Sequence, residues 1–317
     1  MNLAHLPTPL EPLPRLGAHL GLDDLWVKRD DLTGLALGGN KARKLELLLA
    51  DALARGADTL VTGGGPQSNH ARITAAAAAA AGLDCHLALA GPVPAHTDGN
   101  LLLDHLLGAT LHFEGAVEYE EIEQAIATVA DRLAAAGRRP YAIPVGGASV
   151  VGVAAYALAI DELEEQLLAL GRPAFDWIVV ADGSGGTQAG LLAGLGTSTT
   201  RVVGVDVGTR PDLDTAVPEL ASRAAEHLGR DATLGPTIID HDHVGRGYGW
   251  ATDGAIAAMR NAARTEGLIL DPVYSAKAMD ALVTRVRDGR LGGRVLFWHT
   301  GGAPALFARE YERPLTR

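Results

Sequence analysis

A lysine that directly follows two glycines is the residue of this chain best placed to act as a nucleophile. In Gly38-Gly39-Asn40-Lys41 the glycines lead into a helical pattern. Asn40 can cap the amino end of that helix, and Lys41 opens its first turn. The positive end of the helix dipole repels an ammonium group and favours the neutral amine. The pattern therefore predicts that Lys41 has a lowered pKa and can attack a carbonyl group.

Glycine-bearing turns elsewhere support this interpretation, because a lone lysine beside Arg43 and Lys44 would ordinarily be a solvated surface residue. These turns follow predicted strands and open predicted helices, at 63–70, 146–149, 182–187 and 299–304. In parallel α/β folds, ligands bind beyond the carboxyl ends of the strands. We therefore expect the four turns to meet at one site.

The turn at 182–187 carries the clearest binding signal. Ser184-Gly185-Gly186-Thr187 can direct successive backbone amides at one anion, and the dipole of the following helix adds to the attraction. The chain lacks the Gly-x-Gly-x-x-Gly fingerprint of dinucleotide sites and the Gly-x-x-x-x-Gly-Lys-Ser/Thr pattern of P-loops. A phosphate site together with a separate reactive lysine instead predicts pyridoxal 5'-phosphate, whose aldehyde forms a Schiff base with lysine.

Strand and helix patterns alternate around these turns. Strands are predicted at 25–30, 58–62, 85–90, 109–113, 175–181, 201–207 and 294–299, and helices at 41–55, 99–107, 121–135, 212–228, 252–266 and 274–288. Further helices follow the turns at 63–70, 146–149 and 182–187, and residues 1–24 form an extended, proline-rich arm with a short amphipathic piece. Such units predict an α/β fold of parallel sheets flanked by helices. We expect a large lobe of residues 1–44 and 156–317 and a small lobe of residues 45–155, closing on a cleft.

The composition is that of an ordinary globular protein of 317 residues, with 47% hydrophobic and 21% charged residues. A net charge of -11 argues against a nucleic-acid partner, because phosphate contacts require clustered Lys and Arg. The first residues lack the blocks of a signal peptide, and no apolar run is long enough to span a membrane. The single cysteine, Cys85, lies in an apolar run and is expected to be a buried thiol. We therefore expect a cytoplasmic enzyme without a membrane partner.

Several short segments resemble one known family along nearly the whole chain. They are Pro-Thr-Pro-Leu-Glu at 7–11, Val-Lys-Arg-Asp-Asp at 27–31, Gly-Gly-Asn-Lys-Ala-Arg-Lys-Leu-Glu at 38–46, Gln-Ser-Asn-His at 67–70, Pro-Tyr-Ala-Ile-Pro-Val-Gly-Gly at 140–147, Gly-Gly-Thr-Gln-Ala-Gly-Leu at 185–191, Leu-Asp-Pro-Val-Tyr at 270–274 and His-Thr-Gly-Gly-Ala-Pro-Ala-Leu-Phe at 299–307. The chain resembles the fold type II (tryptophan synthase β-like) pyridoxal phosphate enzymes. Within them it is most similar to the D-cysteine desulfhydrase and 1-aminocyclopropane-1-carboxylate deaminase family.

The resemblance implies how the cofactor is held. Lys41 would bind it covalently, and Asn69 would bond the 3-hydroxyl of its ring. The turn at 184–187 and Lys44 would hold the phosphate. Thr300 would meet the pyridine nitrogen, and a neutral hydroxyl partner makes the ring a milder electron sink than a carboxylate would.

The resemblance also implies a substrate side of the site and a homodimer. Ser68, Asn69 and His70 would contact the substrate, with Ser68 facing its carboxylate from a helix amino end that favours an anion. Tyr248 and Tyr274 match tyrosines that line the active site of the family. The partner would therefore be a small amino acid.

Some positions separate the two activities of the family. The deaminase that the chain resembles has Glu after the tyrosine of Asp-Pro-Val-Tyr and Gln after Ser-Asn, where this chain has Ser275 and His70. Together with Thr300, these residues favour the desulfhydrase. Gln188 instead matches the deaminase. The segments 71–73 and 275–277 also depart from the desulfhydrase-like pattern, close to the expected substrate pocket.

The predicted reaction is an α,β-elimination from a small amino acid. The resemblance favours D-cysteine, which would give pyruvate, ammonia and hydrogen sulfide, then L-cysteate sulfo-lyase, then the aminocyclopropane deaminase. Lys41, freed from the cofactor, is the expected base, and Tyr248 or Tyr274 would assist proton transfer. A pyridoxal phosphate protein without turnover is an alternative of another class, although storage requires no tyrosine that faces a substrate.

Other polar residues have simpler interpretations. His241 and His243 lack an evident third ligand, so a polar loop is expected there and no metal site. Asp30 and Asp31 are expected to form a local ion-pair cluster with the basic residues before them. His299 is expected to be a positioned structural histidine, and Ser68 has no ordered His/Asp partners for a hydrolase triad.

Overall fold

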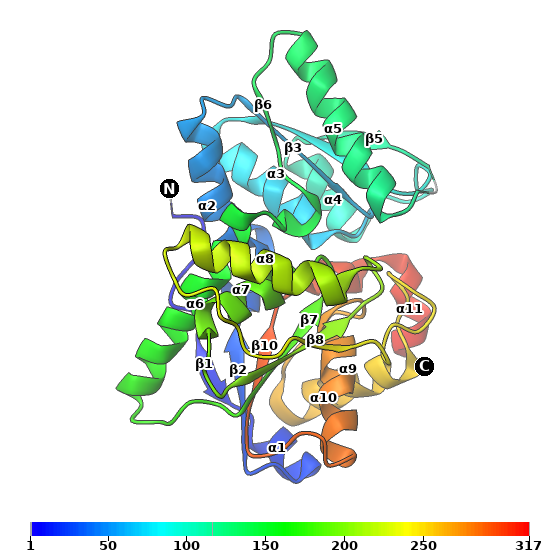
Figure 1. The fold of residues 1–317 in the computed structure, drawn as a ribbon. Coiled ribbons are helices and arrows are strands. Elements are labelled where there is room, and N and C mark those ends of the chain that lie inside the picture. Colours follow the sequence, from blue (N-terminus) through cyan, green and yellow to red (C-terminus); the bar gives the residue numbers. More distant parts are fainter. Residues whose placement is uncertain (1, 116, 317) are drawn as a thin grey trace.

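The computed structural model describes residues 2–115 and 117–316, which form two β-sheets flanked by helices (Figure 1). The predicted α/β fold of parallel sheets is confirmed, apart from one antiparallel edge strand. The four-stranded sheet lies in the upper half of the view and the six-stranded sheet in the lower half. Hydrophobic clusters lie on both faces of each sheet.

The six-stranded sheet has the order β1-β2-β10-β7-β8-β9. Its strands are β1 (Leu10–Pro12), β2 (Asp24–Arg29), β7 (Trp177–Asp182), β8 (Arg201–Asp206), β9 (Ile238–Asp240) and β10 (Arg294–His299). Neighbours pair in parallel except β1 with β2. The central strand β7 is buried on both faces, because Val179 packs into one core and Ile178 and Val180 pack into the other.

Helices cover both faces of this sheet. One face carries α1 (Pro14–Leu20), α9 (Asp253–Glu266) and α10 (Ser275–Arg287), and the other carries α6 (Val150–Ala169), α7 (Gly186–Leu195) and α8 (Leu213–His227). The last helix is α11 (Arg309–Thr316). The 3-10 helices of the described chain are η1 (Asp30–Leu32), η2 (Leu35–Leu37), η3 (Val145–Gly147) and η4 (Ala303–Phe307).

The four-stranded sheet has the order β5-β4-β3-β6 and is parallel throughout. Its strands are β3 (Thr59–Gly64), β4 (Asp84–Leu89), β5 (Thr110–Phe113) and β6 (Pro140–Ala142). On one face, α2 (Lys41–Ala54), α3 (Asn69–Ala81) and α4 (Gly99–Leu106) share a core with Leu60 and Leu87. On the other face, α5 (Tyr119–Ala135) packs against Val61 and Ala88.

The structure adds elements that the hydrophobic pattern did not predict. They are the short strands β1, β6 and β9 and the terminal helix α11. A strand of three residues is too short to show a period in the sequence, so whether it forms depends on the strand with which it pairs. Cys85 is buried in β4, as expected, and burial raises the pKa of its thiol. Over the described residues, none of the helices combines the length and the apolar character that a membrane crossing requires.

Candidate active site

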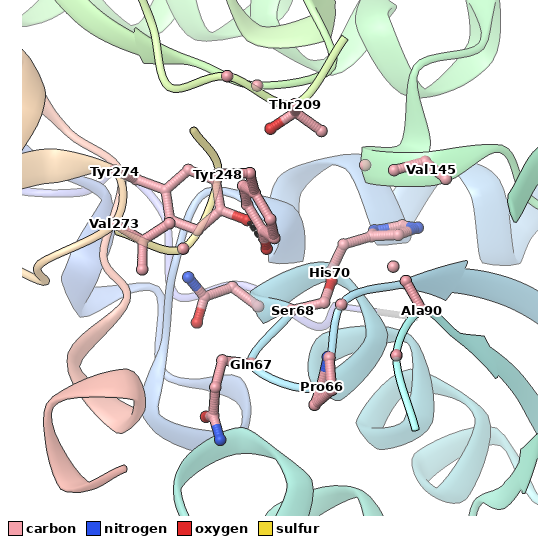
Figure 2. A pocket seen from close by; sticks show the side chains of 18 of the residues that line it. Pro66, Gln67, Ser68, His70, Ala90, Val145, Thr209, Tyr248, Val273 and Tyr274 are labelled. Carbon is pink, nitrogen blue, oxygen red and sulfur yellow. Dashed lines mark hydrogen bonds between the residues drawn. The ribbon is translucent and has the colours of Figure 1, made fainter. Parts of the chain in front are cut away.

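A cavity of about 1140 Å³ opens at the carboxyl ends of β3, β7 and β10, with walls from both sheets (Figure 2). All four predicted glycine turns contribute to it. The wall includes 64–70 after β3, Val145 with Gly146, Asp182–Ser184 with Thr187 after β7, and Thr300 after β10. Small-molecule pockets usually measure about 300–1,000 Å³. The cavity therefore has room for a cofactor and a small substrate together.

Lys41 and the turn at 184–187 meet at Gly146. A Cβ on this glycine would lie 3.6 Å from Nζ of Lys41 and 2.3 Å from Oγ of Ser184. Burial lowers the pKa of Lys41 to about 8, against the opposing attraction of Asp182. The lowered pKa was expected, and burial is its main cause in the structure. At neutral pH an appreciable fraction of this amine is available as the free base.

Asn40 does not cap α2 with its side chain, contrary to expectation. Its Nδ2 donates to Oγ1 of Thr187 at 3.0 Å, and its backbone amide donates to the carbonyl of Thr300 at 3.0 Å. Tyr156 donates a hydrogen bond to the carbonyl of Asn40 at 3.2 Å. Asn40 thus joins the start of α2 to the turn after β7 and to the residue after β10.

The chain reaches Lys41 through a strained turn. Four consecutive residues have positive φ, namely Ala36 at 42°, Leu37 at 72°, Gly38 at 71° and Gly39 at 125°. Left-handed backbone at a residue other than glycine costs about 1–3 kcal/mol. A Cβ on Gly38 would lie 2.1 Å from the carbonyl oxygen of Asp31, so glycine is required there. This turn fixes the direction in which α2 starts.

The turn Ser184-Gly185-Gly186-Thr187 forms a cup at the amino end of α7. Gly185 has a φ of 82°, and a Cβ on Gly186 would lie 2.6 Å from Nζ of Lys44. Lys44 is fully buried behind this cup and donates to the carbonyl of Gly146 at 3.1 Å. Burial, with Lys41 nearby, holds the pKa of Lys44 well below its usual value. An anion in the cup would therefore relieve an unfavourable positive charge.

Ser68, Asn69 and His70 lie on the cavity wall at the amino end of α3. Ser68 caps the helix by accepting from the amide of Ala71 at 3.2 Å, which leaves its hydroxyl proton free. His70 places Nε2 3.0 Å from the hydroxyl of Thr62, which itself donates to a backbone carbonyl. His70 must therefore donate from Nε2, and its Nδ1 has no partner among the described residues. Burial lowers the pKa of His70 well below its usual value, so the ring is neutral.

Tyr248 and Tyr274 also line the cavity, and their hydroxyls are hydrogen-bonded to each other. Figure 2 shows the two phenol rings turned toward each other. Burial raises the pKa of Tyr248 to about 12 and that of Tyr274 well above its usual value. Both phenols are therefore protonated at neutral pH and act as donors.

The residues that depart from the desulfhydrase-like pattern do not border the cavity themselves, although 71–73 directly follow His70 and 275–277 directly follow Tyr274 on its wall. Within the described chain, the wall includes neither 71–73 nor 275–277, and Gln188 is absent from it. The amide of Gln188 donates to the carbonyl of Ile238 at 2.8 Å. Ser275 donates its hydroxyl to the carboxylate of Asp271 at 2.6 Å.

Among the cavity residues that were not singled out from the sequence, two have a buried polar atom without a hydrogen-bond partner in the described chain. Burial raises the pKa of Asp182 to about 6, and its Oδ2 has no hydrogen-bond partner among the described residues. Thr209, which follows β8, likewise has an unpartnered Oγ1. The position of Asp182 at the end of a buried strand was a usable signal. For Thr209 no motif marks the position.

The residues set aside in the sequence have structural partners. Asp31 pairs with Arg29 at 2.8 Å, as expected, whereas Asp30 accepts from Arg43 of α2 at 3.0 Å. His299 is buried, and its Nε2 lies 2.9 Å from the carbonyl of Ile269, as expected of a structural histidine. His241 lies between two aspartates. Across residues 2–115 and 117–316, no three His, Cys, Asp or Glu side chains are grouped as metal ligands would be.

Comparison with known proteins identifies the family. The family model described as "Pyridoxal-phosphate dependent enzyme" matches residues 1–301. The chain belongs to this family. It is 43% identical to a D-cysteine desulfhydrase of Serratia proteamaculans, over 97% of this chain and 95% of the relative. A solved structure described as an ACC deaminase homologue shares 40% identity and a TM-score of 0.91, over 99% of this chain and 94% of that one.

A more distant structure shows the fold alone. A threonine deaminase of Solanum lycopersicum superposes with a TM-score of 0.68 at 15% identity, over 99% of this chain and 83% of that one. The protein is thus a fold type II pyridoxal phosphate enzyme, as the resemblance in its sequence implied.

The residues of the cavity fit this cofactor. Lys41 offers an amine with a lowered pKa, and the cup at 184–187 offers backbone amides backed by the buried ammonium of Lys44. Gly146 leaves the space between them open, because any side chain there would meet both. Burial raises the pKa of Asp182 to about 6, so its carboxylate is still largely ionised at neutral pH and offsets the positive charges of Lys41 and Lys44. The donor set therefore suits a phosphorylated aldehyde.

Proposed function

We propose that the enzyme is a carbon–sulfur lyase that converts D-cysteine and water into pyruvate, ammonia and hydrogen sulfide. The observation that carries the proposal is the meeting of Lys41 and the cup at 184–187 in one cavity, opposite the hydrogen-bonded pair Tyr248 and Tyr274. The relative named D-cysteine desulfhydrase, 43% identical over nearly the whole chain, supports the choice of substrate.

We propose the following roles for the cofactor-binding residues. Lys41 holds the cofactor covalently, Asn69 bonds the 3-hydroxyl of its ring and Thr300 meets its nitrogen. Lys44 and the amides of 184–187 bind the phosphate, supported by the burial of Lys44 directly behind Gly186. When bound, pyridoxal phosphate supplies an electron sink for the electron pair left at the substrate Cα.

The chain's own residues then bind the substrate and move protons. The free hydroxyl proton of Ser68 and the amino end of α3 bind the substrate carboxylate. His70, which is neutral, accepts a hydrogen bond at Nδ1. The amine of Lys41 removes the Cα proton as a general base. The pair Tyr248 and Tyr274 delivers a proton to the leaving sulfur, since both phenols are protonated.

The deaminase is the second candidate, because a solved structure with 40% identity is described as an ACC deaminase homologue. Ser275 argues against the deaminase, because a serine provides no carboxylate next to Tyr274. Its hydroxyl donates to Asp271 outside the cavity wall. L-Cysteate is a further candidate that differs from D-cysteine in its leaving group and handedness.

A substrate panel tests the proposal. The holoenzyme is incubated with D-cysteine, L-cysteine, L-cysteate and 1-aminocyclopropane-1-carboxylate, and sulfide, sulfite and keto acids are quantified. Pyruvate with equimolar sulfide from D-cysteine is expected, and sulfite or 2-oxobutanoate as the main product would assign another substrate. Borohydride reduction and peptide mapping should locate the cofactor on Lys41. A bound cofactor without any keto acid would favour a non-catalytic protein.

We also propose that the enzyme is a cytoplasmic homodimer with a large domain of residues 1–44 and 156–317 and a small domain of residues 45–155. The two sheets support the division, and the proposed boundaries fall within α2 and α6, which pack against each other. The dimer and the compartment rest on the family resemblance. Sedimentation at several protein concentrations tests the dimer, and cell fractionation tests the compartment.

A further inference from the structure

Arg72 is a fully buried arginine on α3 that forms no hydrogen bond with a carboxylate in the described chain. Burial lowers its pKa to about 10, and Asp104 partly offsets this effect without bonding to it. Burying a guanidinium without a carboxylate partner is unfavourable, so the contacts that Arg72 does make must offset this cost. It lies directly behind the cavity wall, in the same helix as Asn69 and His70.

The guanidinium holds the strained turn that leads to Lys41. Its Nη1 donates to the carbonyl of Ala36, and its Nη2 donates to the carbonyl of Gly38 at 3.1 Å. Both carbonyls belong to the run of four residues with positive φ. Two donors of a rigid planar group thus fix a backbone segment that would otherwise relax.

The same guanidinium sets the orientation of Asn69. Oδ1 of Asn69 accepts from Nη2 of Arg72 at 3.4 Å and from Nδ2 of Asn100 at 3.0 Å. Asn100 is itself oriented by Arg72, whose Nε donates to its Oδ1 at 2.7 Å. Because two donors occupy the oxygen of Asn69, its NH2 group is the end left for the cavity.

We propose that Arg72, together with Asn100, is a positioning residue that fixes Lys41 and Asn69 relative to each other. One side chain reaches both the turn before the lysine and the amide of Asn69, which come from separate parts of the chain. The proposal rests on the proposed roles of Lys41 and Asn69 toward the cofactor. Arg72 thus positions the residues at the reacting end of the cofactor, whereas the cup at 184–187 holds the phosphate end.

The test compares Arg72→Lys with the control Arg285→Lys in the full-length holoenzyme. Arg285 bonds the buried Asp240 at 2.6 Å, and neither residue borders the cavity. A lysine cannot replace the planar fork at either position. Dialysis equilibrium gives the dissociation constant of pyridoxal phosphate, a pH titration gives the midpoint of its visible absorption, and steady-state kinetics separates kcat from KM.

For Arg72→Lys we expect cofactor affinity to fall at least about tenfold and kcat to fall more than KM changes. The pH midpoint of the absorption change should rise by about half a pH unit or more. The reason is that the NH2 group of Asn69 would no longer be aligned to donate to the 3-hydroxyl oxygen of the cofactor ring. Arg285→Lys should leave all three unchanged. A folded Arg72→Lys enzyme with unaltered affinity and midpoint would overturn the proposal.

Asn100→Ser provides a second variant, since it leaves the guanidinium on the turn and removes one donor to Asn69. Its absorption midpoint should also rise, with a smaller loss of affinity. If Arg72→Lys does not fold, an unchanged midpoint in Asn100→Ser overturns the proposal. Borohydride mapping of the parent enzyme separates a failure of the proposed role of Arg72 from a failure of the proposed function. A parent without the cofactor on Lys41 contradicts the proposed function itself.

Discussion

The hydroxyl oxygens of Tyr248 and Tyr274 lie 2.6 Å apart on the cavity wall. The two residues come from different segments, one from the loop before α9 and one from the start of α10. Both phenols have raised pKa values because they are buried, so neither ionises at neutral pH. One hydroxyl donates to the other, which leaves the second proton available to a ligand. The pair is thus a source of protons and a poor base.

Replacing either tyrosine by phenylalanine should reduce the release of the leaving group. We expect Tyr248→Phe and Tyr274→Phe each to lower kcat roughly 10²-fold with little change in KM. The double variant should lose much less than the product of the two effects, because the residues act as one hydrogen-bonded unit. The control is Tyr141→Phe, which removes a hydrogen bond to Asp51 outside the cavity wall. Equal losses in the control would contradict the role.

Lys41→Met should abolish activity and also stabilise the apoprotein. The pKa of Lys41 is about 8 in the folded chain, against about 10.4 when unfolded. Between these values the unfolded chain binds more protons, so stability rises with pH, and the full penalty of the buried charge applies below about pH 8. We expect the free energy of unfolding to increase by about 1–2 kcal/mol at neutral pH. Urea unfolding should show this gain shrinking as the pH rises from about 8 to about 10.4, and a gain that is the same at both ends of that range would argue against it.

A methyl group in the cup should weaken binding of the cofactor phosphate. Gly186→Ala places a Cβ 2.6 Å from Nζ of Lys44, so the ammonium must move. We expect the affinity for pyridoxal phosphate to fall at least about tenfold, and protection of the apoprotein by inorganic phosphate to be lost. Gly292→Ala is the matched control, because nothing lies within 4 Å of its Cβ and its φ is not positive. Calorimetric titration of both apoproteins provides the comparison.

Ser68→Ala should lower both stability and substrate binding. Ser68 caps α3, and loss of such a cap costs about 0.5–2 kcal/mol. Thr252 caps α9 in the same way, with Oγ1 accepting from Ala255 at 3.0 Å, away from the cavity wall. Thr252→Ala should therefore show a similar loss of stability. KM should rise in Ser68→Ala alone, and a parallel rise in the control would assign the effect to the cap.

Acid should destabilise the protein through a histidine pair on the four-stranded sheet. Nδ1 of His86 lies 3.0 Å from Nε2 of His112, and Arg132 lies 3.3 Å from the other nitrogen of His112. Since arginine donates only, His112 must donate to His86, and both rings are neutral. Burial lowers both pKa values. The unfolded chain therefore binds extra protons below about pH 6.5, and stability falls as the pH falls through that value.

The variant His112→Asn isolates this effect. The loss of unfolding free energy between about pH 7.5 and pH 5.5 should be smaller in the variant than in the parent. His241 and His243 have raised pKa values and oppose the trend, but they contribute equally to both proteins. An identical pH slope in parent and variant would exclude the pair as its source.

Local chemistry explains which features were predictable from the sequence. The order of strands and helices follows from apolar runs and glycine turns, so the expected elements appear within a few residues of their predicted bounds. Gly185 favours glycine because its φ is 82°, and a glycine-rich turn after a strand is recognisable without coordinates. The strands β1, β6 and β9 were not predictable from the sequence. A strand of only three residues shows no period, so whether it forms depends on the strand with which it pairs.

By itself, the sequence determined the α/β fold and the four turns and led to the proposal of Lys41 as the reactive amine, because each depends on residues adjacent in the chain. The tertiary structure decided why the pKa of Lys41 is low, through burial, and how Arg72 connects the turn before it to Asn69. It also paired Gln188 with the carbonyl of Ile238 and left it out of the cavity wall. These outcomes depend on burial and on contacts between distant segments, which arise only when the two sheets pack together.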